Sequence, residues 1–203
     1  MQDVRKHYLQ RIAVGKELRR LLNAGSIDTY VLLALGITAP EGNYSAWEHN
    51  LGSRILSQRT PEPVFSLAAE LASCNTATGM LDTIYAAAIP WLKVSVGSEM
   101  AMMLKPSTFW VANTRTVWAH LLLKYDFDYA VADEALRLYR VDDQDSKMAY
   151  QIWKAIYHEM GSSVVALTAL GSSEAEQQSV TAGKKPNLWF DAIANALYEQ
   201  HVG

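Results

Sequence analysis

Apolar residues recur at helical spacing along almost the whole chain, and no segment alternates apolar and polar residues as a half-buried strand would. The clearest stripes lie in residues 2–23 and 148–160. The first consists of Val4, Tyr8, Ile12, Leu18, Leu21 and Leu22, and the second of Met148, Ile152, Trp153, Ile156 and Met160. This pattern predicts an all-α protein of about nine or ten helices.

We expect residues 1–203 to form a single compact domain with an aromatic-rich core, because six Trp and ten Tyr accompany a hydrophobic fraction of 50%. The turn at 74–79 is the one candidate for a weak subdivision. Gly161 is expected to end the helix that begins after residue 145. The polar composition of residues 171–185 predicts a surface loop.

The chain is poor in charge: Asp, Glu, Lys and Arg make up 19% of it, against about 25% in typical soluble domains. A fold with few charges covers part of its surface with apolar or aromatic groups, which favours an interface with a partner or a second copy. An unusually aromatic core is the alternative interpretation.

Cys74 is the single cysteine, so an intramolecular disulfide is excluded. No apolar run reaches the roughly 20 residues that cross a bilayer, and the first residues lack the pattern of a signal peptide. We therefore expect a cytoplasmic protein without a membrane partner.

Charge is distributed unevenly. Residues 1–20 hold six basic residues against two acidic ones, whereas residues 126–145 hold seven acidic residues against two arginines. The two regions could pair within the fold, pair between subunits, or remain solvated. The basic helix also offers candidate contacts to nucleic-acid phosphates, namely Arg5, Arg11, Lys16, Arg19 and Arg20.

The segment 107–124 reads as a buried helix after Pro106, yet it carries Asn113, Arg115 and His120. Burying such side chains unpaired is costly. One interpretation is a satisfied polar network that fixes helix register, with Glu99 or Asp82 as the acid that pairs with Arg115. The other interpretation is a catalytic site.

Arg115 and His120 form an Arg-x4-His pattern that resembles the motif of HEPN-type ribonucleases, a family of small all-helical proteins. The resemblance covers about twenty residues from Arg115, and Thr116 stands where that family usually has an Asn. It implies a dimer in which His120 acts on the 2′-hydroxyl proton and Arg115 stabilises the phosphate. Both side chains suit such work, since imidazole transfers protons near neutrality and guanidinium binds phosphate oxygens.

Other motifs are missing. No His-Glu-x-x-His, Glu-x-x-His or Cys pair provides a metal site, the acidic run at 142–145 fits neither an EF-hand nor an Asp-Asp-x-x-Asp pattern, and no Gly-rich phosphate loop occurs. We expect no cofactor and no metal. The residues Met100, Met102 and Met103 offer an adaptable binding surface or, alternatively, fill an irregular core.

The sequence thus favours a non-enzymatic interaction protein, a subunit, adaptor or inhibitor that works through an aromatic and Met-rich helical surface and binds a protein partner or a second copy. A ribonuclease using Arg115, His120 and Asn113 is the first alternative. A nucleic-acid-binding protein using its basic first helix is the second.

Overall fold

The computed structural model describes residues 1–139 and 146–202, and within these ranges it contains helices and connections but no strand. The elements are α1 (Gln2–Asn23), α2 (Ile27–Ala34), η1 (Pro40–Gly42), α3 (Tyr44–Glu48), α4 (Leu51–Gln58), α5 (Pro61–Ser73), α6 (Ala77–Ala87), α7 (Val94–Leu104), α8 (Thr114–Lys124), α9 (Tyr129–Leu136), η2 (Arg137–Tyr139), α10 (Lys147–Gln177) and α11 (Pro186–Val202). The predicted all-α class and single compact domain are confirmed, with eleven α-helices in the described ranges.

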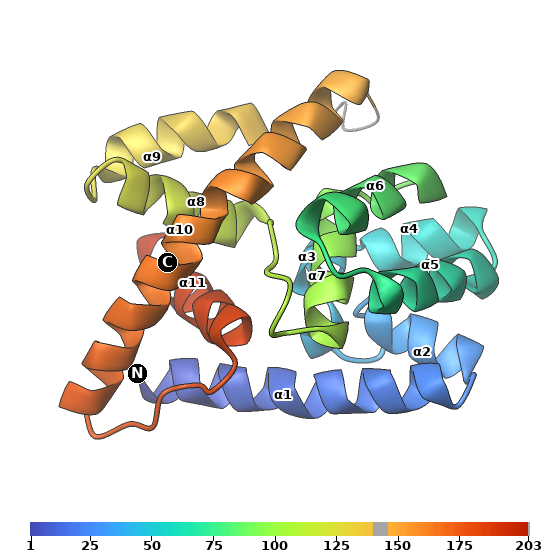
Figure 1. Cartoon of the computed structure of the whole chain (residues 1–203), viewed down its shortest axis with the longest axis horizontal. Helices are drawn as coiled ribbons and strands as arrows, with labels where there is room; N and C mark the ends of the chain where they lie inside the picture. The colour runs from blue at the N-terminus through green and yellow to red at the C-terminus, as the bar shows by residue number, and fades with distance from the viewer. Residues whose placement is uncertain (140–145, 203) are drawn as a thin grey trace.

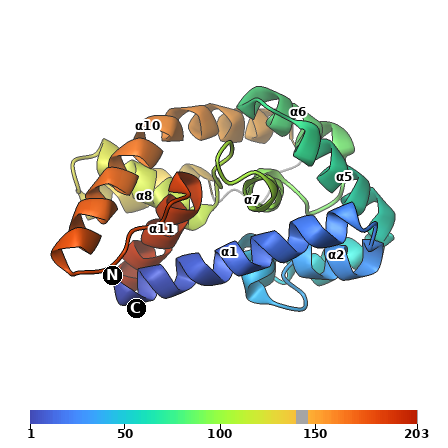
Figure 2. The same ribbon diagram turned by 60° about the horizontal axis from the view of Figure 1, so that its bottom comes forward.

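Helix α7 lies at the centre of the molecule (Figures 1 and 2). Every residue of it except Ser95 is buried, and it packs against α1, α3, α5, α6 and α10. An apolar helix of this kind has no amphipathic pattern because neighbours cover it on all sides. Met100, Met102 and Met103 are at most 1% exposed, so they belong to the core, and the prediction of a Met-rich surface is wrong.

Helix α10 runs without interruption from Lys147 to Gln177 along one side of the molecule (Figure 1). The prediction that Gly161 ends this helix is therefore wrong. The predicted surface loop at 171–185 is also too long, since 171–177 are helical and only 178–185 connect α10 to α11. Gly171 keeps its place in the helix because it lets Ile193 of α11 approach closely, and an added Cβ would lie 2.2 Å from the Ile193 Cδ1 atom.

Two further helix boundaries differ from the predicted ones. Residues 44–58 form two helices rather than one continuous helix, because Asn50 adopts a left-handed conformation (φ 51°) that separates α3 from α4. The helix expected from 107 begins only at Thr114, because Asn113 is its N-cap and the preceding residues run in an irregular connection. The predicted acidic run at 142–145 lies outside the described residues.

Aromatic side chains form much of the core. The fully buried ones include Tyr30, Phe109, Trp118, Tyr157, Trp189 and Phe190. In the part of the chain that the structure describes, no helix has the length and apolarity needed to span a bilayer.

Candidate functional site

Three charged side chains meet in the interior where α1, α7 and α11 come together. Arg11 and Glu99 are 0% exposed and Asp191 is 1% exposed. The Arg11 Nη2 atom lies 2.7 Å from Glu99 Oε1, and its Nε lies 3.4 Å from Asp191 Oδ2. Arg11 also donates through Nη1 to the Glu41 carbonyl at 2.8 Å and sits over the Tyr44 ring at 5.3 Å.

The Glu99 carboxylate closes the N-terminus of the short helix α3. It accepts hydrogen bonds from the backbone N–H groups of Tyr44 (2.9 Å) and Ser45 (3.0 Å) and from the Ser45 hydroxyl (2.6 Å). The first N–H groups of a helix have no partner within it, so an acceptor at this position satisfies them. Glu99 therefore links α7 to α3 as well as to α1.

The Asp191 carboxylate, on α11, is contacted by residues of α1 and by a residue of α11 itself. Besides its ion contact with Arg11, the carboxylate accepts a hydrogen bond from Asn195 Nδ2 to Oδ1 at 3.0 Å, and His7 Nε2 lies 3.8 Å from Oδ2. Burial alone would raise the pKa of Asp191, but Arg11 and then His7 outweigh burial and hold the pKa of this carboxyl below its usual range. Burial likewise opposes the charge of Arg11, while Glu99 and Asp191 outweigh it and raise the pKa of the guanidinium. Arg11 and Asp191 thus remain charged.

Asn113, one of the predicted catalytic residues, has a structural position at the start of α8. Its side-chain oxygen accepts from the backbone N–H groups of Arg115 and Thr116, and the Thr116 hydroxyl bonds back to the Asn113 backbone, which makes a capping box. The Asn113 amide donates to the Ser45 hydroxyl at 3.2 Å. Asn113 therefore connects α8 to the Ser45 hydroxyl, which in turn donates a hydrogen bond to Glu99.

Arg115 leaves the first turn of α8 toward α11 and α3. Its Nη1 donates to Glu199 at 2.6 Å and to Asn195 at 3.0 Å, and its Nη2 lies 3.4 Å from Glu48. Burial lowers the pKa of this guanidinium, but Glu199 and Glu48 together outweigh burial, and the pKa is raised. The expected partners Glu99 and Asp82 were wrong: Glu99 pairs with Arg11, and Asp82 binds Lys154 and Tyr150.

His120 faces α10 instead and is 4% exposed. Its Nδ1 lies 2.8 Å from the Ser163 hydroxyl, and its Nε2 lies 4.0 Å from Glu159. Burial, and then the nearby Lys124, lower the pKa of His120, with Glu159 opposing them in part. The imidazole is therefore a neutral, buried group.

The structure does not bring Arg115 and His120 together. Five residues along a helix correspond to about 500°, so the two side chains leave α8 about 140° apart. Arg115 contacts α11 and α3, whereas His120 contacts α10. Within one chain, Arg115 and His120 therefore do not share a face of α8 from which both could contact the same phosphate.

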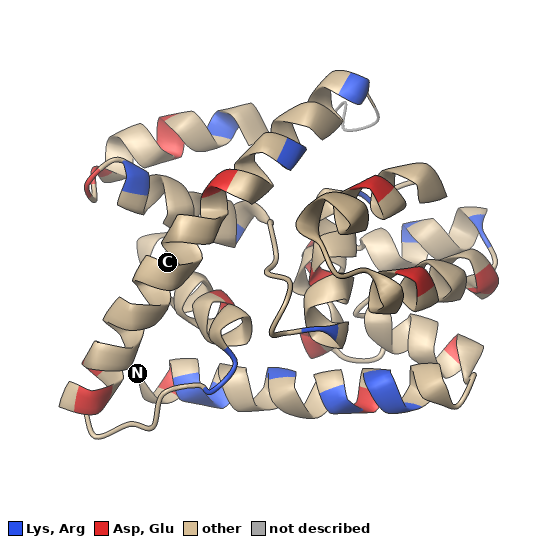
Figure 3. Ribbon diagram, viewed as in Figure 1, with Lys and Arg blue, Asp and Glu red and all other residues tan. Residues whose placement is uncertain are grey.

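Figure 3 colours the basic residues along α1, and those proposed to bind phosphates differ in burial and in their contacts. Arg11 is buried in its ion pairs and cannot reach a phosphate, so its place among the nucleic-acid candidates is wrong. The other candidates lie at the surface with different contacts. Lys16 is exposed, Arg5 donates to the Ala182 carbonyl, Arg19 donates to the Met103 carbonyl and Arg20 pairs with Glu17.

We call the buried network the central polar cluster; it consists of Arg11, Glu99, Asp191, Asn195, Asn113 and Ser45. Sequence reasoning named Arg11, Glu99 and Asn113 in other roles and missed Ser45, Asp191 and Asn195. Helical spacing contained one signal, since Arg11 lies seven residues after Val4 and seven before Leu18 in the buried stripe of α1. Asp191 and Asn195 form an i, i+4 polar pair on a largely buried face. A polar group in such a stripe indicates a buried partner.

The central polar cluster is a buried network of ion pairs and hydrogen bonds, in which Arg11 Nε and Nη2 and Asp191 Oδ2 contact opposite charges without forming hydrogen bonds. Within the described residues, no three His, Cys, Asp or Glu side chains are placed to hold a metal ion. Comparison with known proteins finds no matching family model, no matching curated protein and no matching solved structure.

Proposed function

We propose that this protein is a non-enzymatic interaction protein that associates with further copies of itself through two helical surfaces. The first surface, the α9 face, consists of α9 with its flanking turns. Its exposed apolar residues are Phe127, Tyr129, Val131 and Leu138, and its acidic residues are Asp126, Asp128, Asp133 and Glu134. The proposal rests chiefly on the exposure of these apolar side chains.

Helix α9 is attached to the rest of the molecule on one side only. Its main helical neighbour is α8, and Ala132 and Leu136 are the residues it buries. Phe127, Tyr129, Val131 and Leu138 are between 43% and 55% exposed. Single exposed apolar residues are ordinary, but several within one short segment indicate an interface.

The second surface, the α1 stripe, lies on the outer side of α1. It contains the exposed residues Gln2, Lys6, Leu9, Ala13, Lys16 and Arg20, which follow one another at spacings of three or four. Leu9, which is 48% exposed, and Ala13 form an apolar centre with cationic residues on both sides. The stripe is therefore complementary to the part of the α9 face where apolar groups stand beside Asp126 and Asp128, while Glu134 and Asp133 are paired with Arg137 and His201.

In Figure 1 α9 lies at the top of the molecule and α1 runs along the bottom, so one copy cannot pair the two helices internally. A second copy supplies the missing half. Contact between two different surfaces is heterologous, and it produces a closed ring or an open chain depending on the rotation between copies.

Multi-angle light scattering after size exclusion tests this proposal. We expect the mass of the wild type to rise with protein concentration and to fall with added salt, since charge pairs contribute. Leu9→Glu and Val131→Arg, each of which places a like charge against the opposing surface, should both give monomers. Val165→Glu changes a residue on α10 that is 72% exposed, and it should associate as the wild type does.

Mixing separates a heterologous contact from a symmetric one. Leu9→Glu retains an intact α9 face and Val131→Arg retains an intact α1 stripe, so the two monomeric variants should form a complex when combined. A wild type that stays monomeric at every concentration contradicts the proposal. So does a mixture that remains monomeric when each variant is folded by circular dichroism.

Nucleic-acid binding by α1 is the second candidate, and one observation favours it. The loop that carries Lys184 and Lys185 lies against the start of α1, where the Lys185 N–H donates to the Tyr8 hydroxyl at 3.1 Å, and this extends the basic region of Arg5. Fluorescence anisotropy with labelled RNA and DNA tests it. Affinity that decreases with salt and falls in Lys16→Gln supports this candidate, and no affinity at low salt removes it.

A further inference from the structure

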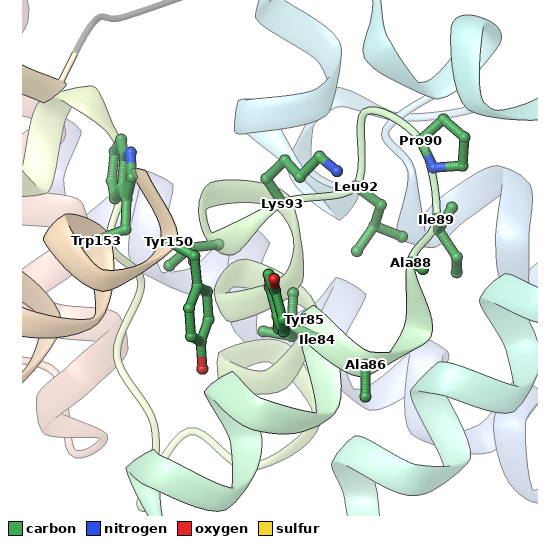
Figure 4. A pocket seen from close by; sticks show the side chains of 11 residues that line it. Ile84, Tyr85, Ala86, Ala88, Ile89, Pro90, Leu92, Lys93, Tyr150 and Trp153 are labelled. Carbon is green, nitrogen blue, oxygen red and sulfur yellow. The ribbon is translucent and has the colours of Figure 1, made fainter. Parts of the chain in front are cut away.

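A cavity of about 560 Å³ opens between the α6–α7 connection and the beginning of α10 (Figure 4). Its walls are mainly apolar and aromatic, and they include Ile84, Tyr85, Ile89, Leu92, Tyr150 and Trp153. Sites that hold small organic molecules have volumes of roughly 300–1,000 Å³ and linings of this kind. None of the described lining residues belongs to the central polar cluster or to the two surfaces proposed for self-association.

Two tyrosine rings form one wall of the cavity, and the polar group of one of them is satisfied without a ligand. The rings of Tyr85 and Tyr150 lie side by side with centroids 4.3 Å apart. In Figure 4 the Tyr150 hydroxyl points away from Leu92, and it donates to Asp82 at 2.7 Å. The Tyr150 ring therefore has a fixed orientation before any ligand arrives, which reduces the entropy lost on binding.

The other wall is aliphatic and has an unusual backbone. Ile84, Ile89 and Leu92 line it, and each is anchored in the core with at most 3% of its surface exposed. Between them, Ala88 (φ 48°) and Trp91 (φ 65°) adopt the left-handed conformation that residues with a Cβ seldom take. Conformations of this kind are concentrated at ligand-binding sites, where the surrounding structure imposes them. This wall is therefore also formed before a ligand binds.

The charged groups around the cavity are already engaged. Lys93 is the one charged residue among the described residues that line it, and Lys93 has an interaction of its own. Asp82, behind the aromatic wall, is paired with Lys154 at 2.7 Å. A charged ligand would lose water here without gaining a partner, and such a loss is costly. The site therefore favours an uncharged ligand.

From these walls we infer that the cavity binds an uncharged, flat aromatic molecule, with its rings packed against Tyr85 and Tyr150. Aromatic rings attract one another beyond the effect of the apolar area that they bury, so a flat aromatic ligand gains more at this wall than a saturated one of the same skeleton.

Isothermal titration calorimetry at neutral pH with 2-naphthol tests the inference. We expect saturable binding of one 2-naphthol per chain. Decahydro-2-naphthol has the same carbon skeleton without aromatic rings, and it should bind about two- to tenfold more weakly. The charged 2-naphthoate should also bind more weakly than 2-naphthol, because its carboxylate must be desolvated.

Two variants locate the site. Ala86 lines the cavity from an exposed position on α6, so Ala86→Trp should fill part of the space and lower the affinity for 2-naphthol at least about tenfold. Ala69→Trp makes the same change at an exposed position on α5 and should bind as the wild type does. Tyr85 is 47% exposed, so Tyr85→Leu should fold normally. It should bind 2-naphthol no more tightly than decahydro-2-naphthol.

Three results would overturn the inference. The first is the absence of saturable 2-naphthol binding. The second is binding by Ala86→Trp or Tyr85→Leu that equals that of the wild type, with folding verified by circular dichroism. The third is an affinity for decahydro-2-naphthol or 2-naphthoate as high as that for 2-naphthol, since the cavity would then select neither an aromatic nor an uncharged ligand.

Discussion

The Arg11 guanidinium and the Glu99 carboxylate lie 2.7 Å apart with neither side chain exposed to solvent. Each group is desolvated, so each depends on the other and on the neighbouring Asp191 for compensation. The pair joins α1 to the central helix α7, and through the Ser45 hydrogen bonds it also fixes the start of α3. The Arg11–Glu99 pair therefore connects three helices, α1, α3 and α7, in the interior.

Removal of Arg11 leaves two buried carboxylates without their cation. We expect Arg11→Met to lower the free energy of unfolding by about 3–5 kcal/mol, the usual range for breaking a buried ion pair from one side. Urea unfolding measures it, and Lys16→Met on the exposed side of the same helix should change stability by less than about 0.5 kcal/mol. Equal effects of the two substitutions would contradict the role of Arg11.

The lowered pKa of Asp191 predicts a specific acid sensitivity. Stability from this ionised carboxyl is complete above its unfolded-state pKa of about 3.9 and is lost as the pH falls through its lower folded-state pKa. The stability difference between the wild type and Asp191→Asn should therefore be constant near neutrality and shrink below about pH 4. Urea unfolding of both proteins across this range measures the change, and a constant difference would exclude Asp191 as its source.

The lowered pKa of His120 predicts a second pH dependence at a different position. The unfolded chain takes up a proton at this residue near pH 6.5, whereas the folded protein resists it, so stability should decrease as the pH falls from about 6.5 to the lower folded-state pKa. His120→Asn retains a partner for Ser163 but cannot titrate, and it should lose this part of the dependence. Thermal unfolding between pH 8 and pH 5 distinguishes the two proteins.

Separation of Arg115 from His120 predicts that neither residue supports RNA cleavage. Incubation of total RNA with the wild type, Arg115→Ala and His120→Ala should give the same background degradation in all three cases. Arg115→Ala should instead lower stability, because Glu199 and Asn195 lose a shared donor. Cleavage by the wild type that disappears in His120→Ala would restore the ribonuclease interpretation.

The sequence predicts the helical class well because apolar spacing reports the buried face of each helix directly. The sequence predicts the central polar cluster poorly, because its ion pairs and hydrogen bonds join residues that are distant in sequence and meet only in the tertiary structure. Arg11 lies on a helix rich in basic residues and therefore resembled a surface cation, although Glu99 and Asp191, distant in sequence, place it inside. Asn113 resembled a polar residue within a helix, whereas its capping of α8 depends on where the chain turns.

The two glycines of α10, Gly161 and Gly171, show the same limit of prediction from sequence, because their surroundings differ. An added Cβ at Gly161 would lie 3.6 Å from the Trp110 ring, which is an ordinary contact, whereas at Gly171 it would lie 2.2 Å from Ile193. Gly161→Ala should therefore stabilise the protein by about 0.5–1 kcal/mol, since alanine favours a helix interior.

Gly171→Ala gains the same helix propensity but must displace Ile193 and with it the packing of α11. We expect a net loss of about 1–3 kcal/mol, the range found when well-packed interiors are overfilled. Urea unfolding of the two variants measures both effects. A destabilising effect of Gly161→Ala would contradict this expectation. It would mean that the backbone at residue 161 needs glycine, as it would if α10 were interrupted there.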